Sequence, residues 1–246
     1  TPAEIARRLE KISMSKCTLD PLRVFALSLL AGAFIALGAA FFTLVTYDDG
    51  NMPAGLMRLL GGLAFCLGLI LVVVAGAELF TGNNLLVMAC IDGLISFRQL
   101  IQNWAIVYIG NFMGALGILV LMYLTGLWWQ GDGSLGNKVV AIADTKVNLG
   151  WMEAFARGVL CNILVCLAVW LCMAGRSVTD KVLAVIFPVT AFVALGFEHS
   201  VANMFFIPAG LLVQTQAETS LAISEQLTIG GFFWHNLIPV TLGNML

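Results

Sequence analysis

Long stretches of this 246-residue chain contain no charged side chain, and this feature limits the chain to one environment. These stretches cover residues 24–47, 59–77, 99–131, 158–175, 182–197 and 226–246. Several of them reach the ~20 apolar residues that a helix needs to cross a bilayer core of roughly 30 Å. Only 11% of all residues are charged, against about 25% in a soluble domain. The sequence therefore predicts an all-α membrane protein that crosses the bilayer several times.

The apolar stretches predict six transmembrane helices. Their expected positions are residues 22–46, 56–80, 101–127, 152–174, 181–213 with an interruption, and 232–246. The last span has 15 residues and a helical length of about 22 Å, so we expect it to be truncated and the chain to be part of a longer one. Residues 1–16 alternate apolar and charged positions with a helical period, which predicts a short amphipathic helix on the membrane or against the base of the protein.

Lysine and arginine are distributed unequally between the two sides of the membrane that this arrangement creates. Eight lie on the side of the N-terminus: Arg7, Arg8, Lys11, Lys16, Arg23, Arg98, Arg176 and Lys181. Four lie on the other side: Arg58, Lys138, Lys146 and Arg157. By the positive-inside rule we expect the N-terminus in the cytoplasm. The net charge of −2 and the lack of a basic cluster give no reason to expect nucleic acid as a partner.

A weak internal repeat relates the two halves of the chain. A shift of 120 residues aligns the second span with the fifth and matches three pairs: Gly76 and Gly196, Glu78 and Glu198, Asn83 and Asn203. A shift of 133 aligns the third span with the sixth and matches three more: Asn103 and Asn236, Gly110 and Gly243, Asn111 and Asn244. Because each half has an odd number of spans, the halves enter the membrane from opposite sides. The sequence thus predicts one transmembrane domain built as an inverted 3+3 repeat, residues 22–127 and 152–246, with a transport site near the midplane.

The stretch FEHSVANMF, Phe197–Phe205, places an acid, an imidazole and an asparagine inside the fifth span. The repeat places a related Glu-x4-Asn element in the second span. A broken helix exposes backbone polar groups, which a membrane protein tolerates only inside the protein or beside a watery cavity. The helix that starts after each break offers N–H donors and a partial positive potential to a small anion. We therefore expect the second and fifth spans to be broken and both breaks to face an internal path.

Each polar residue near the breaks has a structural and a functional interpretation. Glu198 either caps the broken backbone or lines the path. A buried histidine is usually a hydrogen-bonded core residue, but the position of His199 beside an acid at a break favours a functional role. Asn83 and Asn203 are expected to satisfy loose backbone groups. Lys146, in an expected loop after the third span, is either solvated or attracts anions.

Motifs of enzyme chemistry are absent from the sequence. It contains no HExxH, no GxSxG and no cluster of metal ligands, so we expect neither an enzyme nor a bound cofactor or metal. Gly110 and Gly114 form a GxxxG motif, which is typical of close helix contact. A structural or receptor membrane protein is the alternative to a transporter, and a flux assay in liposomes separates the two.

Four segments resemble the formate/nitrite transporter family over essentially the whole chain. They are GAELFTGN (Gly76–Asn83), CNILVCLAVW (Cys161–Trp170), GFEHSVANMF (Gly196–Phe205) and NLIPVTLGN (Asn236–Asn244). Within the family, the resemblance is to bacterial formate channels. It implies a channel for formate in the bacterial inner membrane, built as a homopentamer of aquaporin-like protomers with one pore each. A nitrite or hydrosulfide channel is the alternative, because the pore motifs resemble each other across the family.

The resemblance also implies roles for single residues. His199 resembles the central pore histidine. The residues that resemble its polar partners are Glu198, Asn162, Asn203, Asn244 and Thr81. The residues that resemble the apolar constrictions on either side of it are Phe65, Leu69, Leu79, Phe80 and Phe192. Lys146 resembles a lysine that attracts anions.

These residue types suggest a mechanism. Apolar constrictions exclude a bare carboxylate, because its transfer into a medium of low dielectric costs many kcal/mol, whereas neutral formic acid crosses far more easily. We therefore hypothesise that His199 donates a proton to formate, so that protons are a second partner and transport depends on pH. In the alternative, the histidine only holds the break in shape and the anion passes in its charged form.

Overall fold

Every regular element in the described part of the chain is helical, and four helices are long and apolar enough to cross a membrane. The computed structural model describes residues 1–48, 50, 52–129, 133–215 and 224–246. The four long helices are α2 (Pro21–Thr46), α3 (Ala54–Ala75), α5 (Phe97–Leu124) and α7 (Trp151–Ala174). The chain is thus an all-helical protein of the membrane type.

Shorter helices make up the rest of the fold. They are α1 (Pro2–Thr18), η1 (Gly82–Leu85), α4 (Leu86–Ile91), η2 (Leu127–Trp129), α6 (Ser134–Val147), α8 (Val178–Ala194), α9 (Ser200–Gln214), α10 (Ile229–Gly231), η3 (Phe232–Leu237) and α11 (Ile238–Met245). The η1 and η2 segments are 3₁₀ turns, and η3 is a π-helical segment that continues directly into α11. The helix α3 is followed after a break by η1 and α4, and α8 is followed after a break by α9.

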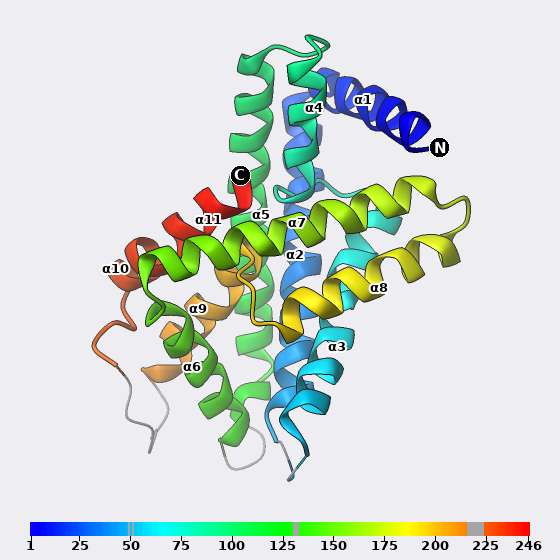
Figure 1. The fold of residues 1–246 in the computed structure, drawn as a ribbon. Helices are drawn as coiled ribbons and strands as arrows, with labels where there is room; N and C mark the ends of the chain where they lie inside the picture. The colour runs from blue at the N-terminus through cyan, green and yellow to red at the C-terminus, as the bar shows by residue number, and fades with distance from the viewer. Residues whose placement is uncertain (49, 51, 130–132, 216–223) are drawn as a thin grey trace.

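The helix α2 packs along both α3 and α5, and Figure 1 shows α2 and α5 running beside each other through the molecule. The helix α7 makes the corresponding contacts with α8 and α11. Figure 1 shows α7 and α8 crossing the first group of helices. Direct packing of α3 against α8 joins the two groups, so the two breaks lie at the junction between them.

Small residues allow α2 and α5 to approach closely. A Cβ atom added to Gly110 would collide with the Ser28 side chain, and one added to Gly114 would collide with the carbonyl oxygen of Leu29. Gly243 on α11 meets the backbone of α7 in the same way, at Phe155. The close helix contact predicted from the GxxxG motif is confirmed.

Helix α6 differs from the loop that we expect from the sequence after the third span. Its apolar side packs against α9 and buries Leu135, Val139, Val140, Ala143 and Val147. Its charged residues lower the mean hydropathy of the segment below that of a membrane span, so the sequence predicts a solvated loop there. As a result, Lys146 lies on a packed helix and its side chain is only 15% exposed.

Helix α1 packs against the protein itself. It contacts α4 and α7, and the Arg8 side chain donates a hydrogen bond of 3.0 Å to the Met173 carbonyl oxygen near the end of α7. These contacts support the packing of this helix against the protein, which is one of the two placements expected from the sequence.

The substitution Gly114→Ala is expected to destabilise the protein, because the new methyl group collides with the carbonyl oxygen of Leu29. Overpacking of this kind costs about 1–3 kcal/mol, and thermal unfolding in detergent measures it as a lowered Tm. Gly117→Ala on the same helix is the matched control, since a Cβ there meets nothing within 4 Å. Equal Tm values for the two variants would contradict the close packing of α2 and α5.

Candidate transport site

Both broken helices turn out of their helical path at a glycine. Gly76 follows α3 and Gly196 follows α8 by two residues, and φ is +74° at both. Residues that carry a Cβ atom rarely adopt this left-handed backbone conformation, so glycine allows each turn without strain. Glu78 and Glu198 each come two residues after the glycine, and both side chains are buried.

The carboxylate of Glu198 is held by one cation and two amides. Lys146 Nζ donates to Oε1 at 2.8 Å, and the Nδ2 atoms of Asn203 and Asn236 donate to Oε2 at 2.7 and 3.1 Å. Asn203 Nδ2 also donates to Asn236 Oδ1 at 2.6 Å. An isolated buried charge is costly, and these partners compensate for it.

The carboxylate of Glu78 has a matching set of partners. Lys16 Nζ and Asn83 Nδ2 both donate to Oε2, at 3.0 and 2.7 Å. Asn83 Nδ2 also donates to Asn103 Oδ1 at 2.9 Å, and its Oδ1 accepts from Lys16 at 2.7 Å. Lys16 therefore pairs with Glu78 as Lys146 pairs with Glu198. Lys16 was not predicted at this site, although a shift of 130 residues aligns it with Lys146.

Asn111 fastens the first break to helix α2. Its Nδ2 donates to the carbonyl oxygens of Ser28 and Glu78 at 2.8 and 2.9 Å, and its Oδ1 accepts from the Phe80 N–H at 2.9 Å. One side chain thus satisfies three backbone groups, two of them at the break.

Asn244 fastens the second break to helix α7 in the same way. Its Nδ2 donates to the carbonyl oxygens of Gly158 and Glu198 at 2.8 and 3.0 Å, and its Oδ1 accepts from the Ser200 N–H at 2.8 Å. Asn162 Nδ2 donates to the Asn244 carbonyl oxygen at 2.5 Å. The expected place of Asn162 and Asn244 around the pore centre stays a prediction; in the structure both side chains bind backbone groups.

One hydrogen bond joins the two breaks directly. His199 Nε2 lies 3.0 Å from Thr81 Oγ1, and both side chains are buried. On the other side of the ring, Nδ1 accepts the Ala202 N–H at 3.1 Å. Nδ1 therefore carries no proton in this arrangement, and the neutral ring holds its proton on Nε2, facing Thr81. The Phe192 ring stacks on the imidazole with 6.0 Å between the ring centroids.

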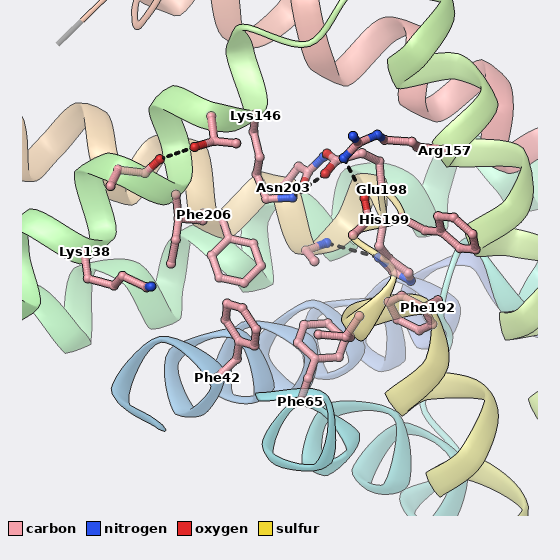
Figure 2. Close-up of a pocket in the computed structure, with 17 residues that line it drawn as sticks. Phe42, Phe65, Lys138, Lys146, Arg157, Phe192, Glu198, His199, Asn203 and Phe206 are labelled. Atoms are coloured by element: carbon pink, nitrogen blue, oxygen red, sulfur yellow. Dashed lines mark hydrogen bonds and ion pairs between the residues drawn. The ribbon is translucent and has the colours of Figure 1, made fainter. Parts of the chain in front are cut away.

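The larger of two cavities at the breaks, which we call the α6 cavity, has a volume of about 280 Å³. Lys146, Glu198 and His199 line it, and Figure 2 shows aromatic rings facing them across the space. Two of these rings, Phe65 and Phe192, contact edge to face with their centroids 5.8 Å apart. The remaining aromatic side chains of its wall are Phe42, Phe197 and Phe206.

The second cavity, which we call the α1 cavity, has a volume of about 190 Å³. Lys16 and Glu78 line it together with the apolar side chains of Ile12, Leu69 and Leu79. His199 is not among the described residues that line this cavity, so the histidine is reached from the α6 side.

The structure brings together most of the residues singled out in the sequence. The expected residues that line the α6 cavity are His199, Glu198, Asn203, Lys146, Phe65 and Phe192. Leu69 and Leu79 line the α1 cavity, and Thr81 joins the site through His199. Phe80 lies elsewhere, since its ring packs against Tyr108 and Trp104 and lines a groove between α5 and α11.

Two broken helices that meet at a buried histidine, with a cavity at each break, are the architecture of a membrane channel or transporter. Residues 3–246 match the formate/nitrite transporter family. The chain belongs to this family.

Two relatives and one solved structure resemble the chain over most of its length. The formate channel FocA of Escherichia coli K12 is 43% identical, over 100% of this chain and 89% of the relative. The formate channel FocA of Haemophilus influenzae is 41% identical, over 100% of this chain and 89% of the relative. A solved pentameric formate channel with formate bound is 40% identical with a TM-score of 0.84, covering 92% of this chain and 91% of that chain.

The substitution Lys146→Met is expected to destabilise the protein by about 3–5 kcal/mol, because it leaves the Glu198 carboxylate buried without its cation. The double variant Lys146→Met with Glu198→Gln removes both charges and should recover most of this loss. Tm values of the wild type, the two single variants and the double variant complete the cycle. If the effects of the two single substitutions simply add in the double variant, the two charges are not coupled.

Proposed function

We propose that this protein is a formate channel that works as a homopentamer with one pore in each protomer. The support comes from the full-length relatives that are formate channels and from the pentameric, formate-bound structure that resembles this chain. The unequal distribution of lysine and arginine supports an N-terminus in the cytoplasm, and the similarity to formate channels of bacteria supports a location in the bacterial inner membrane. The α1 cavity then opens toward the cytoplasm and the α6 cavity toward the periplasm.

The proposal includes a protomer of six spans built as an inverted repeat. In it, α3 with η1 and α4 forms the second span, and α8 with α9 forms the fifth. The hydrogen bonds of Asn111 and Asn244 support this assignment, because each asparagine binds two backbone groups at its own break and one carbonyl oxygen of the neighbouring long helix. The matching Lys-Glu-Asn clusters extend the correspondence to α1 and α6.

Two apolar constrictions select against hydrated ions in this pore. Phe65 and Phe192 form the one on the α6 side, and Leu69 and Leu79 form the one on the α1 side. A bare carboxylate loses its hydration at either constriction at a cost of many kcal/mol, whereas the neutral acid does not. Protonation between the two constrictions therefore lowers the barrier for a weak acid.

Lys146 attracts the anion into the α6 cavity. Its ammonium group has three N–H donors; one is used by Glu198, and the group also lies 5.3 Å from the centroid of the Phe206 ring. Lys16 acts in the same way in the α1 cavity, next to Glu78. Pairing with a glutamate keeps each lysine in place and limits how strongly it holds the anion.

His199 supplies the proton. A formate anion beside the ring favours the protonated imidazolium, because an opposite charge at short range stabilises the charged form. To form the imidazolium, Nδ1 takes up a proton and gives up its hydrogen bond from the Ala202 N–H. The imidazolium then gives the Nε2 proton to a carboxylate oxygen, which leaves a neutral ring protonated on Nδ1 and neutral formic acid. The single observation that carries this step is that His199 lines the α6 cavity and not the α1 cavity, so its proton comes from the side that delivers formate.

The substitution His199→Asn is expected to abolish the dependence of formate uptake on outside pH between about 5 and 8, where an unperturbed histidine titrates. Asparagine still caps α9, because its side-chain oxygen can accept the Ala202 N–H, so the break keeps its shape. Radiolabelled formate uptake into proteoliposomes across this pH range measures the change. Thr81→Val is the control that keeps the imidazole, and its uptake should still depend on pH. A pH profile of His199→Asn that matches the wild type would refute the proton step.

Wild-type protein in liposomes is expected to take up formate faster than nitrite or hydrosulfide supplied at the same concentration. The reason is the set of formate channels to which the chain is similar over its full length. Parallel uptake measurements above the leak of protein-free vesicles test it. Uptake of nitrite or hydrosulfide that exceeds uptake of formate would favour the alternative substrate, and no uptake at all would reject a channel.

A further inference from the structure

The two cavities differ at one pair of corresponding positions. A shift of 130 residues aligns Arg157 on α7 with Leu27 on α2. The backbones of the two residues act alike, since the Arg157 carbonyl oxygen accepts the Glu198 N–H and the Leu27 carbonyl oxygen accepts the Glu78 N–H, both at 3.2 Å. The α7 half therefore carries a cation at a position where the α2 half carries an apolar side chain.

Arg157 reaches the rim of the α6 cavity and is fixed there at two points. Its Nη1 donates to the Gly196 carbonyl oxygen at 3.0 Å, and its Nη2 donates to Glu153 Oε1 at 2.6 Å. These bonds use two of the five N–H donors of a guanidinium group. Figure 2 shows Arg157 and Lys146 on the same wall of the cavity, on either side of Glu198. The Arg157 side chain is 36% exposed and Glu153 is 49% exposed, so water and small solutes reach both.

The charge of Arg157 also changes the potential at the end of helix α8. The carboxyl end of a helix carries a partial negative potential that repels an incoming anion. Arg157 covers this end at Gly196, whereas the described hydrogen bonds give Gly76, at the end of α3, no side-chain cation. In the described chain, three cations line the α6 cavity, namely Lys138, Lys146 and Arg157, and one, Lys16, lines the α1 cavity.

We propose that Arg157 binds the carboxylate of formate at the mouth of the α6 cavity, ahead of Lys146 and His199, and so makes capture from this side tighter than capture from the α1 side. The planar guanidinium fork fits the two oxygens of a carboxylate, and the exposed Glu153 can release the Nη2 donor when the anion arrives. This role rests on the proposed formate channel and adds to it a binding step that works in one direction.

The test compares the two directions of transport in the wild type and in Arg157→Gln. Full-length protein is reconstituted into vesicles that are sorted by access to an N-terminal tag, and initial formate uptake is measured against formate concentration from each side. We expect Arg157→Gln to raise the half-saturating concentration on the α6 side about tenfold, which corresponds to ~1.4 kcal/mol. The maximal rate and the α1-side value should stay unchanged.

Further variants separate binding from a purely structural role. Arg157→Lys keeps the charge but not the fork, so its half-saturating concentration should lie between those of the wild type and Arg157→Gln. Arg176→Gln removes an arginine from the exposed turn after α7 and is the matched control, with both directions unchanged. A residue that only capped α8 would lower Tm and the maximal rate in both directions when replaced, and that result would overturn the proposal.

Salt dependence gives a second readout. Added salt screens exposed charges over about 10 Å at 0.1 M, so the α6-side half-saturating concentration of the wild type should rise with salt more steeply than that of Arg157→Gln. Equal half-saturating concentrations for the wild type and Arg157→Gln on the α6 side would reject the role of Arg157 and leave the channel intact. A wild type that takes up no formate would reject the channel and this inference with it.

Discussion

A break between helices in an apolar surrounding leaves backbone N–H and C=O groups that need hydrogen-bond partners, and the structure of this protein depends on how it supplies them at two breaks. Asn111 and Asn244 each bind the carbonyl oxygen of a break glutamate, a second carbonyl oxygen on the neighbouring helix, and one N–H of the break. Because these asparagines bind the backbone, the side chains at the breaks are available for other contacts. One such contact is the hydrogen bond between His199 Nε2 and Thr81 Oγ1, which joins the two breaks.

The same arrangement explains why two acids are buried in an apolar protein. A buried ion pair contributes little net stability, because desolvation offsets the attraction between its charges. The Lys16–Glu78 and Lys146–Glu198 pairs have a positional role instead: each holds an ammonium group at the wall of a cavity. Asparagine amides also bind each carboxylate, at Oε2 of both glutamates, so each cluster is fixed in geometry while the lysine still faces its cavity.

Much of this could be predicted from the sequence, and the misses have physical reasons. The long apolar helices could be predicted because they contain very few charged residues. The matched Glu-x4-Asn elements indicated the positions of both breaks. Helix α6 was missed because its charged residues lower its hydropathy. Lys16 was missed because its glutamate lies 62 residues away in the chain and nothing local marks the pair.

Side-chain directions within a break were harder to predict than its existence. Leu79 and Phe80 are neighbours, and both were expected to narrow the pore, but Leu79 lines the α1 cavity and Phe80 packs on the other side against Tyr108. In non-helical chain, successive side chains point in different directions and no period assigns them. The contact of Thr81 with His199 spans 118 residues and depends on how the halves dock, which one sequence does not specify.

The central claim is that a proton from the α6 side accompanies each formate past the histidine. It is tested most directly by measuring, in the same wild-type vesicles with the membrane potential held at zero, labelled formate uptake and the acidification of a trapped pH dye, both above the leak of protein-free vesicles. The account predicts one proton gained inside for each formate taken up. Formate uptake that leaves the internal pH unchanged would show that the anion crosses with its charge, and would contradict the account.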